Sequence, residues 1–152
     1  MEWLEGEYRI TTDPARADLD VVHGFLAASY WAAGVPRELV RRSIEHSLAF
    51  SLWHEPPGGP AAQVGFARVI SDRATFAYVG DVFVIESHRG RGLSKWLMRT
   101  VVEHPELQGL RRWCLLTRDA HRLYESVGFS KVAAPERWME RWDAEVYRRG
   151  AS

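Results

Sequence analysis

The residues best suited to chemistry lie in one short stretch, residues 82–97. An apolar run typical of a strand ends there, two glycines and two arginines follow, and a helical pattern then begins. Glycine lets an anion approach the backbone because it has no Cβ, and the N–H groups of a helix N-terminus attract phosphate. Arg89 and Arg91 add cationic donors that suit phosphate oxygens. The stretch therefore predicts a phosphate or pyrophosphate site around Gly90 and Gly92.

Three other interpretations of this stretch are weaker. A Walker A loop needs Gly-x-x-x-x-Gly-Lys-Ser/Thr, and the closely spaced glycines do not match it. An RNA-binding patch would be expected on a basic chain, whereas the net charge here is zero. The purely structural alternative is an ordinary turn from a strand into a helix.

The surrounding elements must position this turn. Strands are predicted at residues 8–12, 50–54, 63–70, 75–85 and 112–117, with one or two more at 130–142. Helices are predicted from Asp18 to the break at Gly34, from Pro36 onward, at 92–103 and at 120–127, with Asp18 and Asp119 as N-caps. We therefore expect an α/β fold of the mixed α+β kind, with a mostly antiparallel central sheet of six to seven strands and helices on both faces.

Composition narrows the class of protein. The 152 residues suit a single domain, residues 1–152, and neutral charge argues against a nucleic-acid partner. The one cysteine, Cys114, excludes an internal disulfide and lies in an apolar strand, and the six histidines show no metal-ligand spacing. No apolar run is long enough to span a bilayer, and no export signal is visible. We expect a cytoplasmic protein with neither a metal nor a membrane partner.

Two motifs resemble the signatures of the GNAT superfamily of acyl-CoA N-acetyltransferases. The family pattern Arg/Gln-x-x-Gly-x-Gly/Ala is matched by Arg89 and Gly92, with Ser94 at the last position. Residues 117–129 resemble the family's second signature, a helix with Ala-x-x-x-Tyr-x-x-x-Gly-Phe after the fifth strand. The resemblance covers roughly residues 8–142 in the order of elements. The family implies a sheet that is splayed between its fourth and fifth strands, here after Val84.

The resemblance also implies acetyl-CoA as co-substrate. Its pantetheine arm would pair with the backbone near the end of the fourth strand, and its pyrophosphate would lie on the glycine turn. The cofactor-binding residues implied are Phe83, Val84, Arg89, Gly90, Arg91, Gly92, Leu93, Ser94, Asp119 and Tyr124.

The implied reaction is direct transfer of acetyl to a primary amine of a small molecule or peptide, in a ternary complex. Tyr124 would protonate the departing thiolate, and the N–H near Val84 could stabilise the oxyanion. Asp81 is the nearest carboxylate for a base, and a water relay is equally open. The structural alternatives are a packed aromatic for Tyr124 and an arginine-paired carboxylate for Asp81.

The acceptor pocket is expected between the first two helices and the last strands. Those regions offer Tyr30, Trp31 and Trp138, together with Glu38 and Trp142, a set that suits a cationic amine or simply fills a core. A non-catalytic acyl-CoA-binding domain is the rival function. The amine, the acyl chain and the oligomeric state stay open, with a homodimer among the options.

Overall fold

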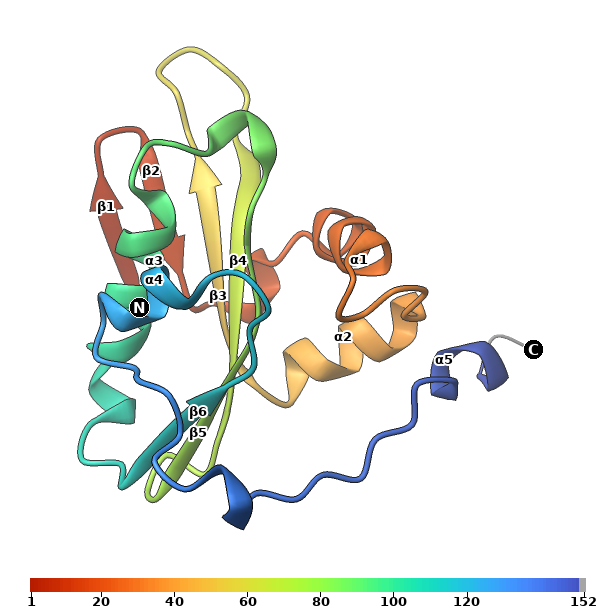
Figure 1. Ribbon diagram of the computed structural model, residues 1–152. Coiled ribbons are helices and arrows are strands. Elements are labelled where there is room, and N and C mark those ends of the chain that lie inside the picture. The colour runs from red at the N-terminus through yellow and green to blue at the C-terminus, as the bar shows by residue number, and fades with distance from the viewer. Residues whose placement is uncertain (151–152) are drawn as a thin grey trace.

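A six-stranded sheet organises the chain (Figure 1). A computed structural model describes residues 1–150. The strands are β1 (Glu2–Glu5), β2 (Tyr8–Thr11), β3 (Leu48–His54), β4 (Ala62–Ser71), β5 (Phe76–Val84) and β6 (Arg112–Leu115), in that order across the sheet. The first four pairings are antiparallel, and β5 and β6 are parallel. The mixed, mostly antiparallel sheet of the prediction is confirmed.

Helices cover both faces of this sheet, as predicted (Figure 1). On one face lie α1 (Leu19–Ala28) and α2 (Arg37–Glu45), which bury their apolar sides against Phe66 and Phe83. On the other face lie α3 (Leu93–Val102) and the short α4 (His121–Glu125), packed in the larger core cluster. A last helix, α5 (Val146–Arg149), follows near the end. No helix in residues 1–150 is long and apolar enough to cross a membrane.

The helix starts on either side of the sheet have different caps. Asp18 caps α1 as predicted, because its Oδ1 accepts hydrogen bonds from the N–H groups of Asp20 and Val21. The predicted cap at Asp119 is wrong. The helix α4 begins two residues later, its N-cap Ala120 has no capping side chain, and Thr117 Oγ1 accepts the Ala120 N–H.

The strands β5 and β6 separate earlier than expected. Their pairing runs from Phe76 with Arg112 to Val79 with Leu115 and then stops, so the predicted separation after Val84 was placed too late. The cause is a β-bulge in β5, where one extra residue lies between the partners of Phe66 and Arg68. Bulges bend a strand away from its neighbour. Beyond Val79, β5 therefore exposes its backbone edge on the side of β6.

The two ends of the chain also depart from the prediction. The strand β1 was not predicted, since a four-residue segment bounded by glutamates is too short to show an alternating pattern. Its Trp3 packs on Phe50 and His104. The strands predicted at 130–142 are wrong, because that segment holds only a 3-10 turn, Pro135–Arg137, and pairs with no strand of the described chain.

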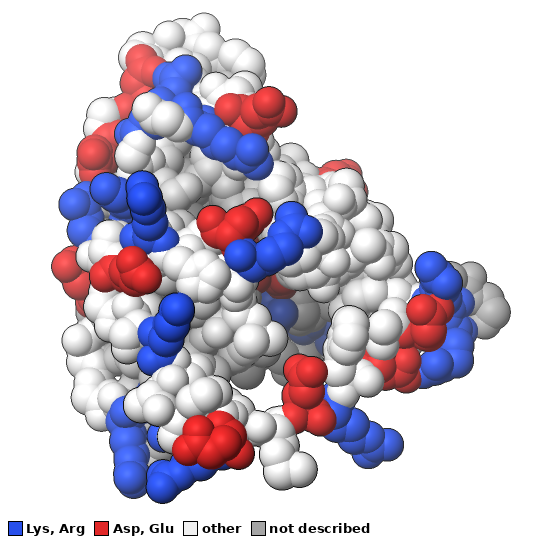
Figure 2. Space-filling model, in the orientation of Figure 1, with Lys and Arg blue, Asp and Glu red and all other residues white. Residues whose placement is uncertain are grey.

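We call residues 138–145 the arm, since they connect that turn to α5. In Figure 1 the arm runs past α2, and Figure 2 shows it clear of the body with a hollow behind it. Tyr147 anchors its far end by packing against the α1–α2 cluster. The arm is thus held at both ends and open between them.

Candidate active site

The glycine turn connects β5 to α3 through two residues with left-handed backbone. Gly90 and Gly92 each have φ of +76°, a conformation that strains any residue with a Cβ. Gly92 is the N-cap of α3 and provides no capping side chain, so the first N–H groups of that helix stay free. A Cβ added to either glycine would meet no atom within 4 Å. The turn therefore has both the conformation and the room for an anion.

A cavity of about 590 Å³ lies against this turn. Six predicted cofactor residues line it, namely Val84, Arg89, Gly90, Gly92, Leu93 and Ser94. Three cationic residues border the cavity, Arg89, Lys95 and Arg122, and none forms an ion pair with another residue in 1–150. Positive charge without a partner in a recess attracts an anion. The cavity is therefore a candidate anion site.

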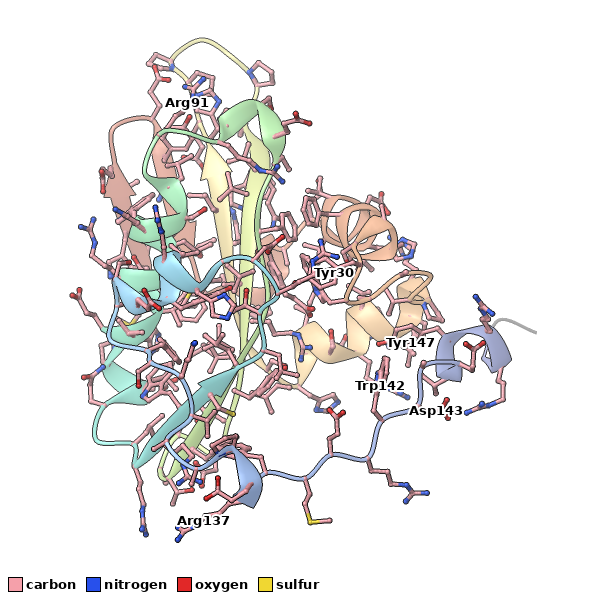
Figure 3. The ribbon with its side chains drawn as sticks, in the orientation of Figure 1. Tyr30, Arg91, Arg137, Trp142, Asp143 and Tyr147 are labelled. Carbon is pink, nitrogen blue, oxygen red and sulfur yellow. The ribbon has the colours of Figure 1, made fainter. Side chains whose placement is uncertain are left out.

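The two arginines of the turn lie in different places. Arg89 lines the cavity, and its Nε donates to the Val84 carbonyl at 2.9 Å, which leaves its Nη groups for a ligand. Arg91 lies outside the lining, near the loop between β3 and β4 (Figure 3), and its Nη1 donates to the Tyr8 hydroxyl at 3.4 Å. The same hydroxyl shares a 2.9 Å hydrogen bond with His88 Nδ1. Arg91 therefore ties the turn to β2.

Tyr124 lies on α4 with 9% of its surface exposed. Burial raises the pKa of its phenol to about 12, and the neighbouring Tyr30, Asp119 and Tyr78 add to the shift. The phenol thus keeps its proton at neutral pH. Tyr124 also lines a larger hollow of about 1150 Å³ beside β6. A protonated phenol that is largely buried but borders a hollow can donate a proton to a leaving group.

Asp81 occupies the bulge of β5, with φ of +56°. Its Oδ2 accepts from Arg68 Nε at 2.8 Å, and its Oδ1 accepts from Trp31 Nε1 at 3.1 Å. The carboxylate is 12% exposed, and the arginine is anchored in turn by Ser47. This network fixes the carboxylate at the point where β5 bends away from β6.

The loop between α1 and α2 brings two of the expected acceptor residues to the site. Trp31 contacts Asp81, as above, and Tyr30 contacts the segment after β6, where the Arg118 guanidinium lies 3.8 Å from the ring centroid. The Arg118 N–H also donates to the Tyr30 hydroxyl at 3.3 Å. Trp138 lies apart from them, over Arg112 at the opposite end of β6. The loop therefore bridges the two separated strands.

The remaining predicted cofactor residues lie in two places, at the end of β5 and on the exposed segment before α4. Phe83 and Val84 are buried at the end of β5, in the half that pairs with β4 but no longer with β6, and the Phe83 ring is stacked on Phe25 at 3.9 Å. Asp119 is mostly exposed, pairs with Arg118 at 3.6 Å, and does not line the cavity at the turn.

Sequence reasoning missed several residues of the cavity at the turn: His88, Lys95, Arg122 and Leu123. Lys95 could have been found, because it lies in the first turn of α3, directly after the glycines. Arg122 could not, since it reaches the turn from α4 only through tertiary packing.

Comparison with known proteins identifies the family. The model of the acetyltransferase (GNAT) domain matches residues 46–131, more than half of the chain. A Gibberella zeae protein named as a candidate acetyltransferase is 31% identical over 140 residues, covering 80% of this chain and 78% of its own. The chain belongs to the GNAT family of acetyltransferases.

Solved structures agree with this fold. A Xanthomonas campestris protein described as belonging to the GNAT family is 48% identical, with a TM-score of 0.85, covering 92% of this chain and 96% of its own. A Clostridium acetobutylicum protein, named as a predicted acetyltransferase with acetyl-CoA, has a TM-score of 0.61 at 15% identity, covering 89% of this chain and 94% of its own. At that identity the likeness concerns the fold alone.

Proposed function

We propose that this chain transfers an acetyl group from acetyl-CoA directly to a primary amine of a small molecule or peptide, with both bound at once. The observation that carries the proposal is the open cavity at the glycine turn, where Arg89, Lys95 and Arg122 have no ionic partner among the described residues. Pyrophosphate is an anion of matching kind. Acetyl-CoA supplies an acetyl group already activated as a thioester.

The edge of β5 that β6 leaves free would align that thioester. Because β6 leaves β5 after Val79, β5 near Val84 has no strand on that side, and an extended ligand could pair with this edge. The Val84 carbonyl already accepts from Arg89 Nε, so the ligand would share or replace that contact. An N–H group near Val84 would stabilise negative charge that develops on the acetyl oxygen. Holding both reactants in one cleft supplies much of the rate.

Tyr124 would act as the general acid and protonate the departing thiolate. Its raised pKa, about 12, supports this role, because the phenol is protonated when the thiolate leaves.

Asp81 would accept an N–H of the amine and orient it. Each oxygen already has one donor, Arg68 or Trp31, but a carboxylate has room for further donors. Whether Asp81 or a water takes the proton is the open part of the mechanism. The aromatic ring of Trp31 beside this carboxylate favours a cationic amine as substrate.

The decisive variant is Tyr124→Phe, which removes only the hydroxyl. We expect turnover on the best amine to fall by about 100-fold, while the affinity for CoA stays within about 2-fold. Thiol release measures the first quantity and titration calorimetry the second. Tyr147→Phe on α5 is the matched control, since it removes a hydroxyl outside the cleft.

Two results would contradict the proposal. If Tyr124→Phe turned over substrate at the wild-type rate, Tyr124 would not be the general acid. Tight CoA binding by the wild type without turnover on any amine would instead favour a non-catalytic acyl-CoA-binding domain.

A further inference from the structure

His88 joins three parts of the fold at the edge of the cavity beside the glycine turn. It ends the 3-10 turn Glu86–His88 and lines that cavity. Its Nδ1 lies 2.9 Å from the Tyr8 hydroxyl on β2, and its ring centroid lies 4.9 Å from that of His54 at the end of β3. The side chain is half-buried, so it is held in place and still within reach of a ligand.

The hydrogen bonds around Tyr8 assign the proton on the His88 ring. Arg91 Nη1 donates to the Tyr8 oxygen at 3.4 Å, and an arginine can only donate. The hydroxyl proton is then available for His88 Nδ1, which acts as the acceptor. A neutral imidazole with an accepting Nδ1 carries its own proton on Nε2. The ring therefore has one N–H donor when neutral, and it gains a positive charge when Nδ1 takes up a second proton.

Positive charge borders His88 on the side of the cavity. Three cationic side chains line the cavity with it, those of Arg89, Lys95 and Arg122. None of the described residues that line this cavity is acidic. Burial, together with the charges of His54 and Arg91, lowers the pKa of His88 below its ordinary 6.5. These surroundings favour the neutral ring at neutral pH until an anion binds.

Two carboxylates lie close to His88 in the chain or in the fold, and neither pairs with it. Glu7 Oε2 binds His54 Nε2 at 3.0 Å. Glu86, in the same 3-10 turn, is exposed and does not line the cavity. A protonated His88 thus has no ionic partner within residues 1–150. A phosphate in the cavity would supply the missing negative charge, and an opposite charge nearby favours the protonated form of a histidine.

We propose that His88 is an anion-binding residue of the glycine turn, and that it takes up a proton from solvent when a phosphate group of the co-substrate binds. Tyr8 is its positioning residue, because its hydroxyl holds the ring against β2 and can become the acceptor once Nδ1 is protonated. By linkage, an anion that binds the protonated ring more tightly must bind better as the pH falls. The proposal rests on acyl-CoA as the ligand of the proposed function, but it does not depend on the transfer step.

The test is the binding of dephospho-CoA by titration calorimetry at about pH 6 and about pH 7.5, in phosphate-free buffers that differ in their heat of ionisation. This ligand keeps the pyrophosphate but lacks the 3′-phosphate, a monoester whose own ionisation near about pH 6 would obscure that of the protein. The wild type should bind about 3- to 10-fold more tightly at the lower pH and should take up protons on binding. His88→Asn keeps an acceptor for the Tyr8 hydroxyl but does not titrate, so both effects should disappear.

Two other histidines provide the controls. His46 is exposed at the end of α2, on the other face of the sheet, so His46→Asn should behave as the wild type does. His54 lies outside the cavity lining, and its charge lowers the pKa of His88. Proton uptake should therefore persist in His54→Asn and should move to higher pH. Circular dichroism verifies that the variants are folded.

The outcomes separate this proposal from the proposed function. Binding without proton uptake would overturn the role of His88 and leave acetyl transfer in place. Uptake that persists in His88→Asn, or that disappears in either control variant, would do the same. Absence of dephospho-CoA binding at both pH values would overturn the role of His88 and would also remove the co-substrate site on which the proposed function depends.

Discussion

Arg122 shows how a single charge contributes to the site. It reaches the cavity at the glycine turn from α4 and has no ionic partner in the described chain. We expect Arg122→Gln to weaken CoA binding by roughly 10- to 100-fold, the value of one hydrogen bond to a charged group. Arg99→Gln, on the exposed side of α3, is the control and should bind CoA normally. Equal affinities in calorimetry would show that no phosphate lies near Arg122.

Tyr124 gives a second test at the residue scale, in the pH dependence of the rate. Its pKa of about 12 keeps the acid form present well above neutral pH. The rate should therefore rise as the amine loses its proton and should not fall again up to about pH 10. A falling limb in kcat/KM between about pH 8 and 10, on a substrate whose own pKa lies higher, would contradict the assignment.

The glycine turn is the element on which the site depends, and a pair of substitutions isolates its backbone. Gly92 has φ of +76° with open space around it, so Gly92→Ala should lower the free energy of unfolding by about 1–2 kcal/mol through strain alone. Gly24 lies inside α1, and a Cβ there would also meet no atom within 4 Å. Gly24→Ala should therefore raise the free energy of unfolding by about 0.5–1 kcal/mol. Urea titration measures both.

CoA binding separates the two glycine variants further. Gly92→Ala should also weaken CoA, because the first N–H groups of α3 shift with the turn. Gly24→Ala should not. The two variants could change the free energy of unfolding in opposite directions and still bind CoA equally well. That result would mean that the turn stabilises the fold but binds no ligand.

At the scale of the whole molecule, buried histidines link stability to pH. His104 is 2% exposed, its Nδ1 accepts the Glu106 N–H, and burial lowers its pKa below the ordinary 6.5. Burial also lowers the pKa of His88. Below pH 6.5 the unfolded chain therefore binds protons that the folded chain excludes, so stability is complete above that value and falls as the pH drops.

Urea titrations at about pH 7.5 and about pH 5.5 measure this slope. His104→Asn keeps an acceptor for the Glu106 N–H but does not titrate. The variant should have a lower free energy of unfolding than the wild type at both pH values. Its free energy of unfolding should also differ less between the two pH values. A slope as steep as that of the wild type would assign the pH dependence to other groups.

Features that depend on neighbouring residues were predicted from the sequence. Features that depend on contact between two separate helices or strands were not. The glycine turn and the cap at Asp18 follow from residue spacing and are present. Arg122 escaped notice because packing alone brings α4 to the turn. The strands predicted at 130–142 were not formed, because a strand needs a partner and within the described chain none pairs with this segment.

The most direct measurement combines acetyl-CoA with a panel of primary amines and identifies the product by mass spectrometry. The account predicts that at least one amine gains a single acetyl group on nitrogen, with one thiol released per product, and that Tyr124→Phe slows this step. Thiol release without an N-acetylated product, or no reaction with any amine despite CoA binding, would contradict it.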